Sequence, residues 1–244
     1  MALLEIDRVS KRFGGLQAVS DVRFSIEERT ITFIVGPNGA GKTTLFNLIT
    51  GVVHPDEGHI RFDGEDITHI SPNRAARIGI GRTFQIVKPL GGLTVLENVM
   101  LGAFMHTSSP SKAAGAAREI LNYLQMEKAM HVTARGLPLA MLKRLEIARA
   151  LAIKPKLILL DEVVAGLPTA EALRLAELLQ KLPARGVAAV GGVEHVMRVV
   201  MSIADRVMVL DHGAQIALGK PQEVVRMPVV IEAYLGTKYK ELGL

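Results

Sequence analysis

The sequence predicts a mixed α/β fold in which a parallel sheet with crossover helices carries an antiparallel β flank and a helical subdomain. A glycine-rich loop directly follows the apolar run 31–35, which is the order of a strand, a tight turn and a helix start. From residue 156 to residue 210, strand and helix patterns alternate, as they do when crossover helices join parallel strands. The 244 residues, 49% of them hydrophobic, are enough to bury one large core.

Short strand patterns separated by turns fill the first part of the chain. We predict strands at residues 3–6, 22–26, 31–35 and 59–62. The last of these ends at the turn Asp63-Gly64, and the series is typical of an antiparallel sheet beside the core. A helix is predicted from the glycine-rich loop to about Ile49, ending before Gly51.

The middle of the chain changes to a helical pattern. It runs from Thr94 to about Met130 and is interrupted by the polar segment 106–112. We therefore predict a helical subdomain over 87–151, inserted between the two parts of the core, 1–86 and 152–244. In the second part, the predicted elements are strand 156–160, helix 169–182, strand 187–193, helix 196–202 and strand 206–210.

The glycine-rich loop, GPNGAGKT, is a complete P-loop. Its glycines let backbone N–H groups turn inward around an anion, and the helix that follows adds about half a positive charge at its N-terminus. Lys42 is expected to reach the β and γ phosphates of a nucleoside triphosphate, and Thr43 to supply a hydroxyl ligand to Mg²⁺. The predicted nucleotide-binding residues of this loop are Gly36, Pro37, Asn38, Gly39, Ala40, Gly41, Lys42, Thr43 and Thr44.

Two adjacent carboxylates follow a second apolar run, LILLDE, at 157–162. The run predicts a buried strand, and strand alternation turns the two acids in different directions. Asp161 is then suited to hold the water shell of Mg²⁺, and Glu162 to polarise the attacking water of phosphoryl transfer.

The net charge of +5 and the pI near 9.6 leave three classes of anionic partner open: nucleotides, nucleic acids and anionic membrane surfaces. Aromatic residues make up only 4% of the chain, so we expect no single-stranded nucleic-acid surface and no nucleic-acid partner. The absence of Cys excludes disulfides and thiolate chemistry. We see no export signal and no apolar run of about 20 residues, so we expect the chain to be soluble by itself.

The order of the motifs resembles that of an ABC transporter ATP-binding subunit. The P-loop is followed by Gln85 in GRTFQ, the helical region, LEIARAL at 145–151, LILLDE, and Glu194-His195. More narrowly, the chain resembles the ATPases of branched-chain amino-acid importers, through strings that cover almost its whole length. These strings are KRFGGLQAV, RTFQ, LTVLENVMLGA, RLEIARAL, DEVVAGL at 161–167, EHVM, ADRVMVLDHG and VIEAYLG.

The resemblance implies further roles for individual residues. Phe13 matches the aromatic residue that stacks on adenine, Gln85 matches the residue that ligates Mg²⁺ and senses the membrane subunit, and His195 matches the histidine that hydrogen-bonds the γ phosphate. ATP and Mg²⁺ are the implied cofactors. The implied catalytic residues are Lys42, Glu162 and His195, and the implied metal residues are Thr43, Gln85 and Asp161.

Two loops depart from the family pattern. Where the family has its signature loop, LSGGQ or LSYGQ, this chain has Leu137-Pro138-Leu139-Ala140-Met141. Pro138 has neither a hydroxyl nor a backbone N–H. In the family, this loop meets the ATP of the opposite subunit, so we expect one weakened composite site, although Pro138 is also suited simply to begin a helix. Pro168 likewise takes the position of an Asn in the loop after Glu162.

The resemblance implies an ATP-hydrolysing subunit that powers a membrane importer of branched-chain or related amino acids. The implied partners are a second ABC ATPase subunit and transmembrane permease subunits, at the cytoplasmic face of the inner membrane. Three alternatives stay open: an ATPase for urea or amide import, an ATPase of lipopolysaccharide export, and a low-turnover nucleotide-dependent regulatory subunit. The sequence does not identify the solute.

Overall fold

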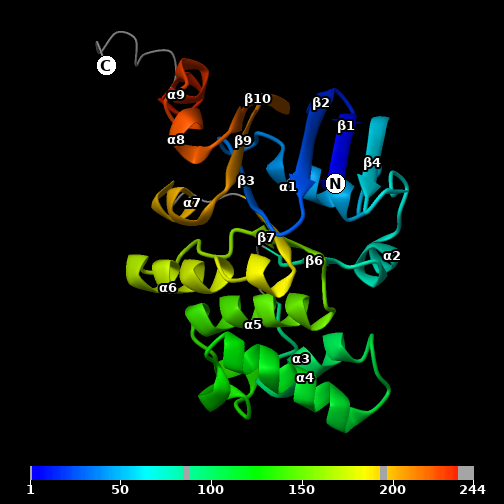
Figure 1. The fold of residues 1–244 in the computed structure, drawn as a ribbon, viewed down its shortest axis with the longest axis vertical. Helices are drawn as coiled ribbons and strands as arrows, with labels where there is room; N and C mark the ends of the chain where they lie inside the picture. The colour runs from blue at the N-terminus through cyan, green and yellow to red at the C-terminus, as the bar shows by residue number, and fades with distance from the viewer. Residues whose placement is uncertain (1, 85–87, 193–196, 236–244) are drawn as a thin grey trace.

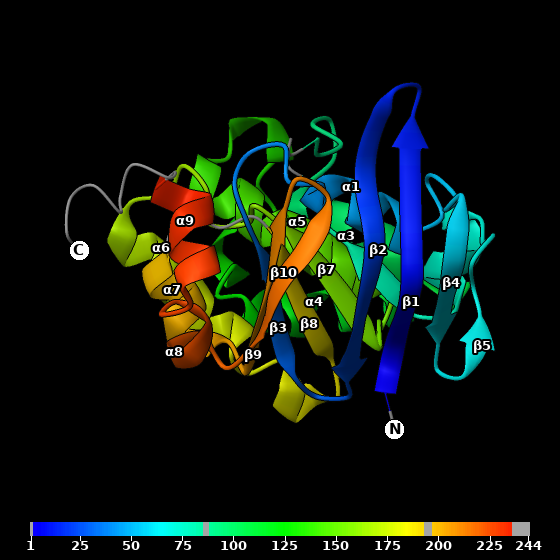
Figure 2. The same cartoon turned by 90° about the horizontal axis from the view of Figure 1, so that it is seen from above.

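One sheet of ten strands runs through the part of the chain described by the computed structural model, which covers residues 2–84, 88–192 and 197–235 (Figures 1 and 2). The strand order is β5-β4-β1-β2-β10-β9-β3-β8-β7-β6. The strands are β1 (Ala2–Phe13), β2 (Leu16–Glu27), β3 (Ile31–Val35), β4 (Glu57–Phe62), β5 (Glu65–Asp66), β6 (Ile80–Arg82), β7 (Leu157–Asp161), β8 (Ala188–Gly192), β9 (Arg206–Asp211) and β10 (Ala214–Gly219).

The centre of the sheet is parallel, as predicted. Strand β3 pairs in parallel with β8 and β9, and β7 pairs in parallel with β8 and β6. Every residue of β3 and of β7 is buried, because elements cover both faces of a parallel sheet. The apolar run that leads into the P-loop and the run that leads into the acidic pair therefore lie close together, separated only by β8.

The antiparallel flank was predicted, but its first two strands are longer than expected. Strands β1 and β2 each have 12 residues, whereas the predicted strands were 3–6 and 22–26. The pairing of β1 with β2 shifts register between Ile6 and Val9, and Arg8 has a φ of 53°. This irregularity lets the strand continue through charged residues that break the alternating pattern in the sequence.

The helices are α1 (Lys42–Ile49), α2 (Pro72–Arg77), α3 (Val95–Ala103), α4 (Pro110–Tyr123), α5 (Leu139–Ala152), α6 (Thr169–Leu179), α7 (Met197–Ile203), α8 (Pro221–Val224) and α9 (Pro228–Leu235), with 3₁₀ turns at Glu127–Ala129, Ala134–Gly136 and Pro183–Arg185. Helix α1 begins at Lys42 and ends at Ile49, as predicted. Helix α6 ends at Leu179, three residues before the predicted end.

Helices α3, α4 and α5 pack together below the sheet in Figure 1, where the sequence predicted a helical insertion. Helix α3 begins at a capping box: Glu97 N–H donates to Thr94 Oγ1 at 3.2 Å, and Thr94 N–H donates to Glu97 Oε2 at 2.8 Å. The subdomain boundaries at 87 and 151 stay a prediction.

The sequence did not predict α2, α8, α9, β5, β6 or β10. Most of these elements are too short for a periodic pattern: β6 has three residues, and α8 has four. Among the described residues, none of the helices combines the length and the apolar character needed to cross a bilayer.

We predict that Leu159→Ala lowers the free energy of unfolding by about 2–5 kcal/mol, because the Leu159 side chain is fully buried at the centre of β7 and its removal leaves a cavity. Urea denaturation measures the change. Leu16→Ala is the control, because Leu16 is 68% exposed and its loss should change the unfolding free energy by less than about 0.5 kcal/mol. Equal losses in the two variants would contradict the packing of β7.

Candidate functional site

The P-loop connects β3 to α1 and requires glycine at two positions. Gly36 has a φ of 153°, and a Cβ there would lie 2.0 Å from the carbonyl oxygen of Leu210. Gly41 has a φ of 100°, and a Cβ there would lie 2.3 Å from the carbonyl oxygen of Ala18. Both residues therefore serve backbone conformations and close approaches that other residue types exclude.

Lys42 folds back onto its own loop. Its side chain is buried, and Nζ donates to the carbonyl oxygens of Gly36 at 2.5 Å and Pro37 at 2.6 Å. Burial lowers the pKa of Lys42, and the nearby carboxylates of Glu162 and Asp161 oppose that shift. The ammonium group is therefore held by backbone oxygens of the P-loop itself.

One cavity joins the P-loop, an aromatic ring and a carboxylate. Residues 38–44 of the P-loop line it together with Phe13, Gln17, Glu162 and His212. Phe13 lies at the end of β1 with its ring 46% exposed, and Lys11 Nζ lies 5.6 Å from the ring centroid. The structure thus brings Phe13, the P-loop and Glu162 to one place, although they are far apart in the sequence.

The two adjacent acids at the end of β7, Asp161 and Glu162, line different cavities. Asp161, with Thr43, lines a hollow on one side of α1, whereas Glu162 lines the cavity that holds Phe13. Glu162 has a φ of 49°, a costly conformation for a residue other than glycine, and Lys143 Nζ donates to its carbonyl oxygen at 2.8 Å. A strained backbone of this kind is often found where a catalytic side chain must be aimed.

Arg82, which sequence reasoning did not single out, is the cation beside Asp161. Its Nη2 lies 3.3 Å from Asp161 Oδ2, and its Nη1 donates to Asn47 Oδ1 at 2.6 Å and Thr50 Oγ1 at 3.2 Å. Burial raises the pKa of Asp161, and Arg82 opposes that shift. The string GRTFQ contains a sequence signal for the role of Arg82, because a charged residue there ends a buried edge strand.

The hollow lined by Thr43 and Asp161 offers oxygen ligands that are suited to Mg²⁺. Thr43 and Asp161 present a hydroxyl and a carboxylate to one hollow, and Mg²⁺ prefers oxygen ligands and retains several waters. In the described ranges, no three His, Asp or Glu side chains form a cluster able to hold a metal ion by themselves. The arrangement therefore suits an ion that is held partly by a phosphate ligand and water.

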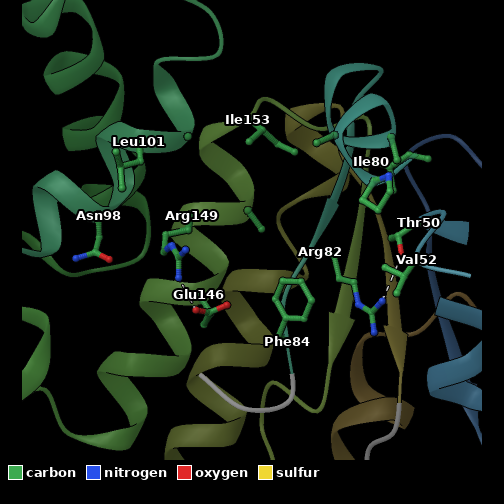
Figure 3. A pocket seen from close by; sticks show the side chains of 15 residues that line it. Thr50, Val52, Ile80, Arg82, Phe84, Asn98, Leu101, Glu146, Arg149 and Ile153 are labelled. Atoms are coloured by element: carbon green, nitrogen blue, oxygen red, sulfur yellow. Dashed lines mark hydrogen bonds and ion pairs between the residues drawn. The ribbon is translucent and has the colours of Figure 1, made fainter. Parts of the chain in front are cut away.

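A groove opens between the sheet and the helices of the subdomain (Figure 3). Figure 3 shows Leu101 of α3 on one side, Arg149 and Glu146 of α5 next to it, and Arg82 of β6 opposite. Arg149 Nη1 lies 2.8 Å from Glu146 Oε1, and burial raises the pKa of Glu146. The groove wall is lined by Thr50, Val52, Pro72, Ala75, Ala76, Ile80, Arg82, Phe84, Asn98, Leu101, Gly102, Glu146, Arg149, Ala150 and Ile153.

The two loops that depart from the family pattern, at Pro138 and at Pro168, lie side by side. Pro138 precedes the first residue of α5 and its carbonyl oxygen accepts from Leu142 N–H at 3.0 Å, so it does begin the helix. Pro168 stands at the same position before α6. Residues 138–141 and 166–168 line one hollow, which holds the 3.4 Å pair between Arg144 and Glu171. Gln85, Glu194 and His195 lie outside the described residues.

A P-loop between a buried strand and a helix, with a carboxylate at the end of a nearby parallel strand, defines a P-loop nucleotide-binding protein. The ABC transporter family matches residues 19–165, and a second family, the branched-chain amino acid ATP-binding cassette transporter, matches residues 214–240. The chain belongs to the ABC transporter family, and it is an ATP-binding cassette ATPase.

Curated relatives resemble the chain over nearly its whole length. It is 36% identical to the high-affinity branched-chain amino acid transport ATP-binding protein BraF of Pseudomonas aeruginosa, with 96% of this chain and 98% of that protein covered. It is 35% identical to the corresponding protein LivG of Escherichia coli K12, with the same coverage. The probable LivG of Archaeoglobus fulgidus is 35% identical, with 99% of this chain and 98% of that protein covered.

Solved structures confirm the fold. The ADP conformation of an ATP-binding cassette from an ABC transporter superposes with a TM-score of 0.88 at 33% identity, covering 97% of this chain and 99% of that one. A dimeric cassette in a post-hydrolysis state, bound to ADP and Pi, superposes with a TM-score of 0.80 at 27% identity, covering 89% and 98%. The predicted fold class and family resemblance are therefore confirmed.

We expect Arg82→Met to lower the free energy of unfolding by about 3–5 kcal/mol, because it leaves the Asp161 carboxylate buried without its ion-pair partner. Chemical denaturation measures the change. Arg174→Met is the matched control: Arg174 is 66% exposed and pairs with Glu171 at 3.3 Å, a surface pair whose loss should cost less than about 1 kcal/mol. A loss in Arg82→Met no greater than in the control would show that the buried pair is not needed.

Proposed function

We propose that this chain is the ATP-hydrolysing subunit of a membrane importer of branched-chain or related amino acids. The observation that carries the proposal is the single cavity lined by the P-loop, Phe13 and Glu162, in a chain whose full-length relatives are named branched-chain amino acid transport ATP-binding proteins. The urea, amide and lipopolysaccharide alternatives have no comparable support in the names of those relatives.

The residues of the cavity divide the work of phosphoryl transfer. Phe13 stacks on adenine, the backbone N–H groups of the P-loop hold the phosphates, and Lys42 turns from Gly36 toward the β and γ phosphates. Thr43 and Asp161, with Gln85, would hold Mg²⁺, and the ion when bound would supply positive charge to the phosphate oxygens. Glu162 polarises the attacking water, and His195 hydrogen-bonds the γ phosphate.

The partners follow from two surfaces. The groove between the sheet and the subdomain combines apolar walls, such as Leu101 and Ile153, with the charges of Arg82, Glu146 and Arg149, and we assign it to transmembrane permease subunits. The hollow at Pro138 and Pro168 is assigned to a second ABC ATPase subunit. The assembly then lies at the cytoplasmic face of the inner membrane.

A heterodimer of this chain with a different ATPase subunit agrees best with the sequence of the signature loop. The signature loop, residues 137–141, contains neither the serine nor the glycines of the family pattern, so it offers no serine hydroxyl and no glycine N–H to a facing γ phosphate. This chain's own P-loop and Glu162, in contrast, match the family pattern. One composite site is then competent and the other impaired. The low-turnover regulatory alternative differs in one measurable respect: its turnover would stay low even with partner subunits.

Glu162→Gln should leave ATP binding intact and slow hydrolysis by a factor on the order of 10² to 10⁴, because Gln keeps the size of the side chain but is not a base. Nucleotide titration measures binding, and phosphate release measures turnover in the partnered complex. Near-wild-type turnover in this variant contradicts the role of Glu162, and loss of ATP binding contradicts the separation of binding from chemistry.

Restoring the signature by Pro138→Ser with Ala140→Gly should strengthen ATP-dependent self-association of the isolated chain. Each recovered hydrogen bond to a charged phosphate contributes about 1.5 to 3 kcal/mol. The measurement is sedimentation in a Glu162→Gln background, which keeps the ATP intact. If the chain with its own signature already dimerises tightly on ATP, the loop is a working variant and the asymmetric pair is wrong.

A further inference from the structure

Lys143 is a buried cation of helix α5, close to the strand that carries the acidic pair. Helix α5 lies between the sheet and helices α3 and α4, and it contacts β7 (Figure 1). Lys143 is only 5% exposed, and lysine side chains are almost never buried to this extent without a partner. What its ammonium group contacts therefore indicates what the residue does.

The ammonium group contacts the backbone of the second acid. Lys143 Nζ donates to the carbonyl oxygen of Glu162 at 2.8 Å, and the backbone N–H of Ala165 donates to the same oxygen at 3.2 Å. Burial raises the pKa of Asp161, and the charges of Arg82 and Lys143 oppose that rise. The ammonium group therefore lies beside both acids at the end of β7, and it is bonded to the backbone of Glu162.

The backbone of Glu162 has a conformation that needs support. Its φ of 49° lies in the left-handed region, which is costly for a residue other than glycine and persists only where surrounding contacts hold it. The bond from Lys143 fixes the peptide group that follows Glu162. On the other side, the backbone N–H of Asp161 donates to Thr83 Oγ1 at 3.0 Å. Side chains from two other elements thus hold the chain before and after Glu162.

The direction of the Glu162 carboxylate depends on this backbone. A general base must lie within hydrogen-bond reach of the water it activates, and Glu162 lines the cavity that also contains the P-loop. We propose that Lys143 is a positioning residue for ATP hydrolysis, whose ammonium group holds the Glu162 backbone in the conformation that aims the carboxylate into the nucleotide cavity. This inference rests on the proposed function, because it takes Glu162 as the group that polarises the attacking water.

Lys143→Met tests the inference, because Met keeps a long unbranched side chain but donates no hydrogen bond. The Glu162 carbonyl oxygen retains its bond from Ala165, so the midpoint of thermal unfolding should be nearly unchanged. In the partnered complex at saturating ATP, kcat should fall about 10- to 100-fold, the effect of a small misplacement of a catalytic group. KM for ATP and the affinity measured by nucleotide titration should stay within about twofold, because Lys143 does not line the nucleotide cavity.

Two further variants separate positioning from a general structural role. Lys143→Arg keeps a cationic N–H donor and should restore kcat to within about fivefold of wild type. In a Glu162→Gln background the carboxylate is already absent, so adding Lys143→Met should slow single-turnover hydrolysis by no more than about twofold further. If Lys143→Arg is as slow as Lys143→Met, or if Lys143→Met has its full effect without the carboxylate, the inference is overturned.

Tyr123→Phe is the matched control. The Tyr123 hydroxyl also donates to a backbone carbonyl oxygen, that of Leu178, but this bond joins α4 to α6 instead of reaching the acidic pair. Its loss should leave kcat within about twofold of wild type. Equal losses of kcat in Tyr123→Phe and Lys143→Met would overturn the inference, because any bond between a side chain and the backbone would then have the same effect.

The remaining outcomes separate this inference from the proposed function. Wild-type kcat in Lys143→Met, together with slow turnover in Glu162→Gln, overturns the inference alone. A Lys143→Met chain that does not fold, or that loses ATP affinity together with turnover, shows a general structural role and also overturns it. The proposed function fails by a different result, in which Glu162→Gln itself turns over at nearly the wild-type rate in the partnered complex.

Discussion

The burial of one carboxylate is the constraint on which the site depends. Asp161 is 2% exposed at the end of β7, and an unpaired carboxylate there would be costly. Arg82 of the neighbouring strand β6 supplies the opposite charge, and its Nη1 donates to Asn47 of α1 and to Thr50, the residue after that helix. One guanidinium therefore holds together the P-loop helix, the strand that carries the carboxylate and the edge of the sheet.

The same guanidinium borders two cavities. The residues Arg82, Phe84, Glu146 and Arg149 line both the groove of Figure 3 and the hollow that contains Thr43 and Asp161. A partner seated in the groove contacts side chains that also border the predicted metal site, so the route between the two sites is a single layer of side chains. Strand β6, which carries Arg82, pairs directly with β7, which carries Asp161.

Local patterns predicted the parts of the fold and site that depend on contiguous residues. The P-loop, β3, β7 and α1 were predicted because their glycines and apolar runs are local signals. The full length of β1 and the Arg82–Asp161 pair were not predicted, because a bulge and a tertiary contact determine them. The roles of individual site residues stay predictions, and Gln85 and His195 lie outside the described residues.

Helix α5 separates the residues that depart from the family's signature loop from the side chain that contacts Glu162. Its first residues face outward: Pro138 is exposed before the helix, and Leu139 is 44% exposed. Lys143, five residues after Pro138, is buried, and its Nζ donates to the carbonyl oxygen of Glu162 at 2.8 Å. The residues that depart from the family pattern are thus concentrated at the exposed end of the helix, and the inward side chain of Lys143 still contacts Glu162. In the proposed pair of ATPase subunits, these departures alter the surface offered to the second subunit, whereas the contact of Lys143 with Glu162 does not depend on them.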